Sequence, residues 1–320
     1  MNETSESLAK LGWSSFFETQ LTNSDELARV VRVASVRRTA LEVQDGHSSF
    51  AVLTQYSMLQ KWIPAVGDWL VLDGAKETIV RALERKSILQ RQPAQRQRRQ
   101  ATTELDPMVA NSDRAFIVSS CNDEFNESRI ERFLVLCHSG EVEPIVVLTK
   151  IDLCADVEPF SQRAQAISNK LNVHLINCLD AEQCQQLSGY FTPNQTITLL
   201  GSSGVGKSTL INTLSGNIER LTGQVRDSDQ RGRHTTTERK LLAVPASGYV
   251  VDMPGLKAVG VSTSTVGIRR TFPEIWELAA DCRFRNCQHG AEPGCKVKES
   301  IESGALSERR FRNYQKMFVP

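Results

Sequence analysis

The sequence predicts a multidomain protein with a β-barrel first, an α/β domain with a parallel sheet second, and a mostly helical, metal-binding domain last. Short β-rich runs fill residues 28–83, strands alternate with helices from residue 114 to residue 252, and three cysteines and a histidine crowd into residues 282–295. A chain of 320 residues has room for two domains and a small third one. We expect the domains at residues 1–95, 96–260 and 261–320.

The overall composition is that of an ordinary folded protein. Hydrophobic residues make up 40% of the chain, charged residues 23%, and the net charge is +1, which excludes a general polycation. No apolar run approaches the roughly 20 residues of a membrane-spanning helix, and the first residues lack the basic and apolar regions of a signal peptide. We therefore expect a cytoplasmic protein without a membrane partner. In that reducing compartment, the eight cysteines favour metal binding over disulfides.

Residues 28–83 predict a small barrel. Its strands are expected at residues 28–35, 40–43, 49–53, 69–72 and 78–83, with turn-forming residues between them. An OB-fold barrel, which commonly binds oligonucleotides, is the first choice, although an SH3-like barrel that binds protein fits the same pattern. Residues 4–22 predict one short helix or a peripheral arm in front of it.

A basic segment follows the barrel. It carries seven cations against the single acid Glu84, and these cations are Arg81, Arg85, Lys86, Arg91, Arg96, Arg98 and Arg99. Glutamines, Pro93 and Ala94 separate them, so residues 81–100 are typical of a flexible linker at a domain boundary. The segment is either a solvated linker or, as its position beside the barrel favours, a contact for the phosphate backbone of a nucleic acid.

From residue 114 onward, apolar strand runs alternate with helical spacing. Strands are expected at residues 115–118, 144–148 and 173–176, and helices at 128–139 and 161–171. Repeated strand–helix–strand units predict a parallel sheet with helices on both faces.

A glycine-rich run between the apolar residues 196–200 and the helix-like residues 210–214 predicts a phosphate-binding loop. The loop comprises Gly201, Ser202, Ser203, Gly204, Val205, Gly206, Lys207, Ser208 and Thr209. Its three glycines let the backbone turn tightly and aim N–H groups inward, and the helix start adds the positive end of its dipole. Lys207 is expected to reach the β- and γ-phosphates of a nucleotide, and Ser208 to bind magnesium.

A second motif follows the strand at residues 144–148. It consists of Thr149, Lys150, Ile151 and Asp152, at the carboxyl end of a strand, where open α/β sheets bind ligands. The carboxylate of Asp152 can accept hydrogen bonds from the ring N–H and exocyclic amine of guanine, which adenine cannot supply in that geometry. Lys150 is expected along the base plane, and Thr149, in place of the usual asparagine, to steady the loop. Together with the phosphate loop, this motif predicts a guanine nucleotide.

Residues 248–255 predict a contact to the γ-phosphate. This strand ends at Asp252, which can hold magnesium through water, and the N–H of Gly255 can sense the γ-phosphate. The polar loop at residues 231–238 contains Thr235, Thr236 and Thr237, one of which is expected to supply a hydroxyl to magnesium. Thr236 is favoured.

The order of these motifs differs from that in Ras-like GTPases, where the phosphate loop comes first and the guanine motif fourth. Here residues 149–152 precede residues 201–209, which precede residues 235–237 and 252–255. From about residue 28 onward the chain therefore resembles the ribosome small-subunit-dependent GTPases, circularly permuted assembly factors with an OB barrel in front and a zinc domain behind. The resemblance implies conversion of GTP to GDP, action with the small ribosomal subunit and its rRNA in late assembly or maturation, and stimulation by that subunit. We expect a monomer.

Two positions depart from the usual patterns. Leu256 stands where Ras-like enzymes have a water-orienting glutamine, so unaided hydrolysis is expected to be slow. His234 is the candidate within the chain for aligning the water, with an exposed loop histidine as the alternative. The loop that backs the base is expected at residues 177–179, which lack the usual Ser-Ala pair.

The C-terminal part predicts a metal site. Residues 263–280 are expected to form a helix with a break near Pro273, and the possible ligands after it are Cys282, Cys287, His289 and Cys295. Three thiolates and one imidazole can close a tetrahedron around one structural zinc. Basic side chains surround these ligands, with Phe284, Phe311 and Tyr314 among them. That mixture suits RNA, or the final helix packs back onto the preceding domain.

Two other classes of function fit parts of the sequence. An RNA-binding scaffold with a purely structural nucleotide would keep the same motifs. A P-loop kinase or transport ATPase would use ATP, which Asp152 disfavours.

Overall fold

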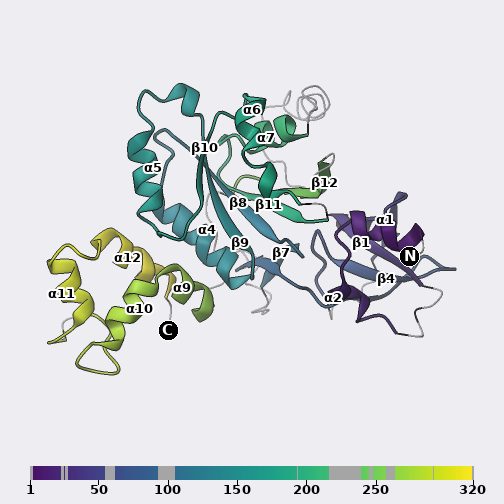
Figure 1. The fold of residues 1–320 in the computed structure, drawn as a ribbon. Helices are drawn as coiled ribbons and strands as arrows, with labels where there is room; N and C mark the ends of the chain where they lie inside the picture. Colours follow the sequence, from purple (N-terminus) through teal and green to yellow (C-terminus); the bar gives the residue numbers. More distant parts are fainter. Residues whose placement is uncertain are drawn as a thin grey trace.

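The structure is a computed structural model that describes residues 3–22, 25, 28–54, 62–92, 105–192, 194–215, 239–244, 248–256, 264–290 and 292–318. Figure 1 shows three groups of elements in these ranges. An antiparallel sheet with two short helices lies at one end, an α/β unit in the middle, and a group of helices at the other end.

The N-terminal sheet consists of five strands, one at each of the predicted positions. They are β1 (Ala28–Val36), β2 (Ala40–Gln44), β3 (Ser49–Leu53), β4 (Trp69–Asp73) and β5 (Ile79–Ala82). All pairings are antiparallel, in the order β3-β2-β1-β4-β5. Within the described ranges no β3–β5 pairing closes the sheet, so the OB-fold barrel stays a prediction.

The chain before this sheet forms two short helices where the sequence predicted one helix or an arm. They are α1 (Glu3–Lys10) and α2 (Ser15–Glu18). Leu8, Leu11 and Phe17 are buried together with Trp69 of β4, which holds both helices against the sheet.

The prediction of a flexible linker at residues 81–100 is wrong for its described part. Residues 88–91 form β6 (Ile88–Arg91), which pairs with β7 (Asp106–Ala110). Four of the seven cations form ion pairs: Arg81 with Asp25, Arg85 with Asp68, Lys86 with Asp113 and Arg91 with Asp106. All four acids lie at least 15 residues away from their cations in the sequence, which is why a local count of charges missed them. Arg96, Arg98 and Arg99 lie outside the described residues.

The middle unit contains the predicted parallel sheet. Its parallel strands are β8 (Arg114–Ser120), β9 (Glu143–Thr149), β10 (Val173–Ile176), β11 (Thr196–Leu200) and β13 (Gly248–Asp252), in the order β10-β9-β8-β11-β13. The sequence did not predict β12 (Lys240–Val244), which runs antiparallel to β13. One register pair, Ser35 with Lys240, joins β12 to β1, so the N-terminal sheet continues the central one.

Helices cover both faces of the central sheet, because alternate strand residues point to opposite sides. On one face lie α4 (Glu127–Ser139) and α5 (Glu158–Gln165), over a core that includes Ile117 and Val146. On the other face lie α6 (Ala181–Gln185) and α7 (Lys207–Leu214), over a core that includes Phe116 and Val147. The α5 helix ends six residues before the predicted limit at residue 171.

The C-terminal group is helical, as predicted, and consists of α9 (Thr265–Thr271), α10 (Pro273–Ala280), α11 (Lys296–Glu302) and α12 (Glu308–Met317). The predicted break falls at Phe272, directly before Pro273. The first of these helices packs closely on α4, since a Cβ at Gly267 would lie 2.7 Å from the carbonyl oxygen of Val135.

The last helix packs back onto the α/β unit. Of the two roles expected for its arginines and aromatic residues, RNA binding or packing, the described contacts show packing. The carboxylate of Glu131 on α4 is fully buried and accepts hydrogen bonds from Arg309 at 2.9 and 3.1 Å, from Arg310 at 3.0 Å and from Asn313. Phe311 and Tyr314 are buried as well. These five side chains of α12 therefore hold the helix against the rest of the protein.

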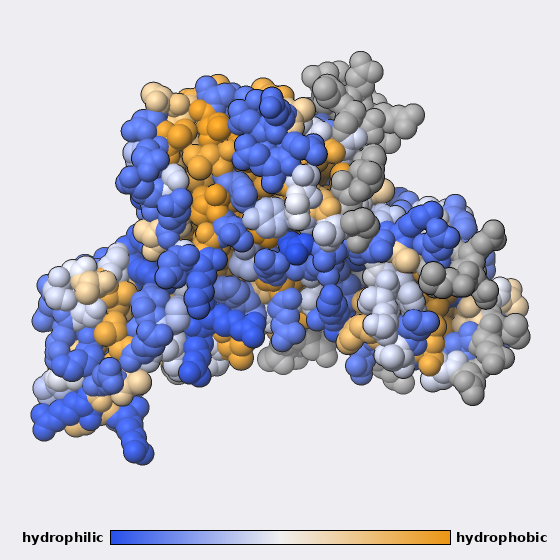
Figure 2. Space-filling view, in the orientation of Figure 1, coloured by the Kyte–Doolittle hydropathy of each residue, from blue (hydrophilic) through white to orange (hydrophobic). Residues whose placement is uncertain are grey.

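Figure 2 shows where apolar residues reach the surface in one view: they gather over the central sheet near β10, between α5 and α6. Within the described ranges, no helix combines the length and the apolar character needed to cross a membrane.

Candidate functional site

The glycine-rich loop lies between the end of β11 and the start of α7 and needs its glycines. Gly201, Gly204 and Gly206 have φ values of +153°, +79° and +99°, which favour glycine. A Cβ at Gly201 would also lie 2.5 Å from the carbonyl oxygen of Val118 on β8. The loop therefore has the tight backbone path that a phosphate cradle requires.

Lys207 lies folded over this loop. Its ammonium group donates to the carbonyl oxygens of Gly201 at 3.0 Å and Ser202 at 2.7 Å. Burial lowers the pKa of Lys207, and the nearby Asp252 carboxylate opposes that change. Burial likewise raises the pKa of Asp252, with Lys207 opposing it. Ser208 is exposed on the first turn of α7.

The segment after β13 packs directly against the phosphate loop. A Cβ at Gly255 would lie 2.4 Å from the backbone nitrogen of Ser203, so only glycine fits there. The N–H of Leu256 donates to the carbonyl oxygen of Gly201 at 3.0 Å. A shift in the position of this segment would therefore displace the phosphate loop directly.

Thr149 connects the end of β9 to the same loop. Its hydroxyl donates to the carbonyl oxygen of Val205 at 2.6 Å, and the side chain is fully buried. Lys150 follows with φ +58° and leads into a short 3-10 turn, Ile151–Leu153, on which Asp152 is exposed.

The loop at residues 177–179 completes this set of segments. The hydroxyl of Thr213 on α7 donates to the carbonyl oxygen of Cys178 at 2.6 Å, and the thiol sulfur of Cys178 lies 3.6 Å from the position of a Cβ at Gly206. Burial raises the pKa of Cys178 to about 12; Cys184 and Asp152 also raise it, and Lys150 lowers it. The fold thus brings residues 149–152, 177–179, 201–208 and 252–256 to one edge of the sheet.

The sequence did not predict that two apolar residues of these loops are exposed to solvent. Leu153 and Leu179 are 78% and 76% exposed, one directly after Asp152 and the other directly after Cys178. Residues 177–179 were expected beside the base that residues 149–152 bind, but no sequence pattern indicated that these two leucines would be exposed. His234, Thr235, Thr236 and Thr237 lie outside the described residues.

The four predicted metal ligands come together in the loop between α10 and α11. The ligand atoms of Cys282, Cys287, His289 and Cys295 all lie within 4.8 Å of one another. The Nδ1 atom of His289 is 3.7 Å from the sulfur of Cys282 and 3.4 Å from that of Cys295, and these two sulfurs are 3.9 Å apart. A tetrahedral zinc site with ordinary bond lengths has ligand separations of about 3.6–3.8 Å. The donor set and its spacing fit zinc.

The backbone around this cluster is arranged to bring the ligands together. His289 and Gly294 have φ values of +59° and +73°, and the N–H of Arg283 donates to the carbonyl oxygen of Gly294 at 3.1 Å. The ring of Phe311 on α12 meets the ring of His289 edge to face, at 6.2 Å between centroids. The cluster is thus tied to the helix that clamps α4.

Comparisons with known proteins agree on one family. A family model described as RsgA GTPase matches residues 82–262. Proteins named small ribosomal subunit biogenesis GTPase RsgA are similar: one from Mesorhizobium japonicum is 39% identical over 98% of this chain and 90% of its own length, and one from Xylella fastidiosa is 44% identical over 79% and 72%.

Solved structures have the same fold. The crystal structure of YjeQ from Thermotoga maritima has a TM-score of 0.62, with 27% identity, over 91% of this chain and 97% of that one. YloQ, described as a circularly permuted GTPase, has a TM-score of 0.60 with 22% identity, over 92% and 96%. The permuted motif order is therefore a property of a known fold.

Proposed function

This chain belongs to the RsgA GTPase family, and we propose that it hydrolyses GTP to GDP on the small ribosomal subunit, in late assembly or maturation of that subunit. One observation in the structure supports this most directly. The guanine motif, the phosphate loop and the segment after β13 meet at a single edge of the sheet, although up to about 100 residues separate them in the sequence.

Each part of this edge has a role in the proposal. The loop N–H groups hold the phosphates, and Lys207 exchanges its two carbonyl partners for phosphate oxygens when the nucleotide binds. Asp152 accepts hydrogen bonds from guanine. Ser208 and Asp252, together with Thr236, would hold magnesium, which neutralises the charge that develops on the phosphates.

The absence of a glutamine after Gly255 makes hydrolysis dependent on a partner. The side chain of Leu256 has no polar group that could orient a water. It is also only 8% exposed and packs in the core with Met253. We propose His234 for that role, with the subunit completing the site, so hydrolysis is slow for the free protein and faster on the subunit.

The remaining parts serve attachment. We propose that the N-terminal sheet, as an OB-fold barrel, and the zinc domain bind rRNA, with Cys282, Cys287, His289 and Cys295 holding one structural zinc. We propose that the protein is a cytoplasmic monomer with three domains, at residues 1–95, 96–260 and 261–320.

The test is a turnover assay with the full-length protein, GTP or ATP, and purified small ribosomal subunits. We expect slow release of phosphate from GTP alone, strong stimulation by the subunits, and little release from ATP. Lys207→Ala protein is the control for contaminating activity. A protein that binds GTP but gains no turnover on subunits would be a scaffold with a structural nucleotide, which contradicts the proposal.

A further inference from the structure

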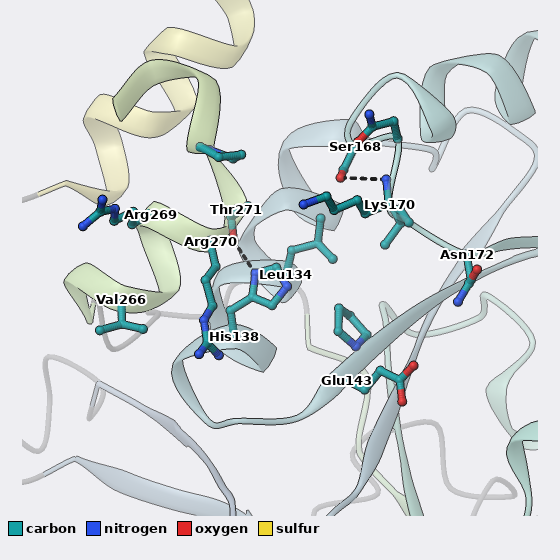
Figure 3. Close-up of a pocket in the computed structure, with 14 residues that line it drawn as sticks. Leu134, His138, Glu143, Ser168, Lys170, Asn172, Val266, Arg269, Arg270 and Thr271 are labelled. Atoms are coloured by element: carbon teal, nitrogen blue, oxygen red, sulfur yellow. Dashed lines mark hydrogen bonds between the residues drawn. The ribbon is translucent and has the colours of Figure 1, made fainter. Parts of the chain in front are cut away.

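A cavity lies away from the nucleotide edge, where the C-terminal helices meet the α/β unit. It has a volume of about 660 Å³ and is lined by α4, α9, the start of β9 and the segment at residues 168–172 (Figure 3). Pockets for small organic ligands have volumes of about 300–1,000 Å³. No residue of the phosphate loop, guanine motif or metal cluster lines it.

The rim of this cavity carries uncompensated positive charge. Lys170, Arg269 and Arg270 are exposed, and within the described ranges none of them has a carboxylate within ion-pairing distance. The one acid of the lining, Glu143, is held by Arg114 at 2.8 Å. In Figure 3, Lys170 extends toward Thr271 on α9, and Arg270 lies beside His138.

The rest of the lining is apolar or neutral. Leu134, Pro144 and Leu171 supply apolar surface, and Asn169 and Asn172 supply amide groups that can both donate and accept hydrogen bonds. His138 donates or accepts at Nδ1 with the hydroxyl of Thr271 at 2.9 Å. Burial lowers the pKa of His138 to about 4, so it adds no positive charge at neutral pH.

We propose that this cavity, named here the α4–α9 cavity, binds one nucleotide unit, with its phosphate on Lys170 and Arg270 and its base on the apolar surface beside Asn172. Cations with no protein partner match a phosphate, apolar surface matches the face of a base, and side-chain amides match its polar edge. An inorganic anion would use only the first of these three features. The unit comes either from a free nucleotide or from an unpaired position of an RNA chain.

Binding to the full-length protein tests this proposal. The phosphate-loop site is first saturated with GDP and magnesium, and CMP, inorganic phosphate or a guanosine-free single-stranded RNA of ten nucleotides is then titrated by calorimetry. We expect one further equivalent of CMP or of the RNA to bind, more tightly than phosphate. Lys170→Ala and Arg270→Ala should each weaken that binding about ten-fold, because each loses one charged hydrogen bond to phosphate.

Two further variants make the test specific. Lys10→Ala, an exposed lysine on α1 outside the cavity, carries the same charge change and should leave CMP binding unchanged. Asn172→Ala should weaken CMP but not phosphate. The exposure of all four residues makes misfolding a small concern, and thermal unfolding checks it.

The outcomes separate the sources of the ligand. Tighter binding of RNA than of CMP, with 4-thiouridine crosslinks to residues 134–144 or 168–172, assigns the cavity to RNA, and equal binding assigns it to a free nucleotide. The proposal fails if no further equivalent binds, if phosphate binds as tightly as CMP, or if Lys10→Ala weakens binding as much as Lys170→Ala. GTP turnover on subunits is measured in parallel with the wild-type protein. Absence of stimulated turnover would contradict the proposed function and leave the result for the cavity standing.

Discussion

Asp152, which we propose as the acceptor for guanine, has an accessible carboxylate. It lies exposed on the 3-10 turn after β9, directly after the positive-φ residue Lys150, while Thr149 ties that turn to the phosphate loop. Within the described residues its carboxylate forms no hydrogen bond or ion pair with the protein. Both carboxylate oxygens can therefore accept hydrogen bonds from a nucleotide base.

We expect Asp152→Asn to relax the preference for guanine. The amide loses the charged acceptor, so the affinity for GDP should fall by about 2 kcal/mol while that for ADP changes little. Titration with fluorescent GDP and ADP measures the ratio. Asp156→Asn is the matched control, since Asp156 is exposed four residues later and accepts a bond from the N–H of Glu158 that an asparagine can also accept. An unchanged ratio in Asp152→Asn would contradict the guanine assignment.

His138 should make stability depend on pH. Its pKa is about 4 in the folded protein because burial, aided by Arg270, disfavours the charged ring, against about 6.5 when unfolded. The neutral ring is therefore accommodated fully above pH 6.5, and stability is lost as the pH falls from 6.5 toward 4. Between pH 7 and pH 5, His138→Gln should lose about 2 kcal/mol less unfolding free energy than the wild type. The free energy of unfolding in urea is measured for both proteins between pH 5 and pH 7. An equal dependence on pH in the two proteins would rule this prediction out.

At the scale of elements, the contact between α4 and α12 depends on one buried carboxylate. Glu131 is the shared acceptor for Arg309, Arg310 and Asn313, and Arg310 also donates to the carbonyl oxygen of Thr271 at 2.8 Å. Removing that carboxylate leaves Arg309 and Asn313 without this acceptor, and leaves the buried Arg310 with Glu274, at 2.5 Å, as its remaining ion-pair partner.

We expect Glu131→Ala to destabilise the docking of α12 by about 2–3 kcal/mol, because Arg310 loses one of its two carboxylate partners and Arg309 and Asn313 lose a charged acceptor. Hydrogen exchange of the amides in residues 308–317 measures the effect. Glu308→Gln breaks an exposed ion pair with Arg312 on the same helix and should cost under about 0.5 kcal/mol. Equal exchange rates in the two variants would show that the buried carboxylate is not what holds the helix.

The metal loop between α10 and α11 is the other element that depends on a few side chains. Residues 281–295 contain no helix or strand within their described part, so an ion held by the four ligands would add to the few hydrogen bonds that fix their conformation.

Cys287→Ser should therefore lose stoichiometric zinc and expose this loop to proteolysis. Metal content measured by atomic absorption, together with limited digestion, tests both effects. Cys154→Ser changes a cysteine outside the cluster and should retain one zinc. A full zinc content in Cys287→Ser would contradict the ligand set.

For the whole molecule, one core joins the nucleotide edge to the C-terminal helices. Met253 and Leu256, which flank Gly255, belong to the same hydrophobic cluster as Ile268 of α9, Phe272 and Phe311 of α12. Because Gly255 touches the phosphate loop and its neighbours touch this cluster, a change at the γ-phosphate has a packed route to the helical group.

We expect nucleotide state to change the protection of the C-terminal helices and the affinity for the subunit. Hydrogen exchange of residues 264–318 should differ between protein bound to a non-hydrolysable GTP analogue and protein bound to GDP, and so should subunit affinity in a sedimentation assay. Residues 3–10 of α1, which lie outside this cluster, serve as the internal control. Identical protection and identical affinity in the two states would exclude the coupling.

The sequence by itself determined the local features. The five N-terminal strands, the parallel strands, the glycine loop and the break at Pro273 were all predicted, because periodicity, positive φ values and proline geometry act over a few residues. The clustering of the four metal ligands follows from their close spacing for the same reason.

Only the tertiary structure decided where charges and faces find their partners. The cations at residues 81–91 proved to be ion-paired, and the arginines at 309 and 310 proved to clamp Glu131, since their acids come from distant segments. The β12 strand and the α4–α9 cavity were not predicted either, because each exists only through elements that pack together from separate parts of the chain. Electrostatic and packing energies depend on distance in space, and a local pattern of residues does not contain those distances.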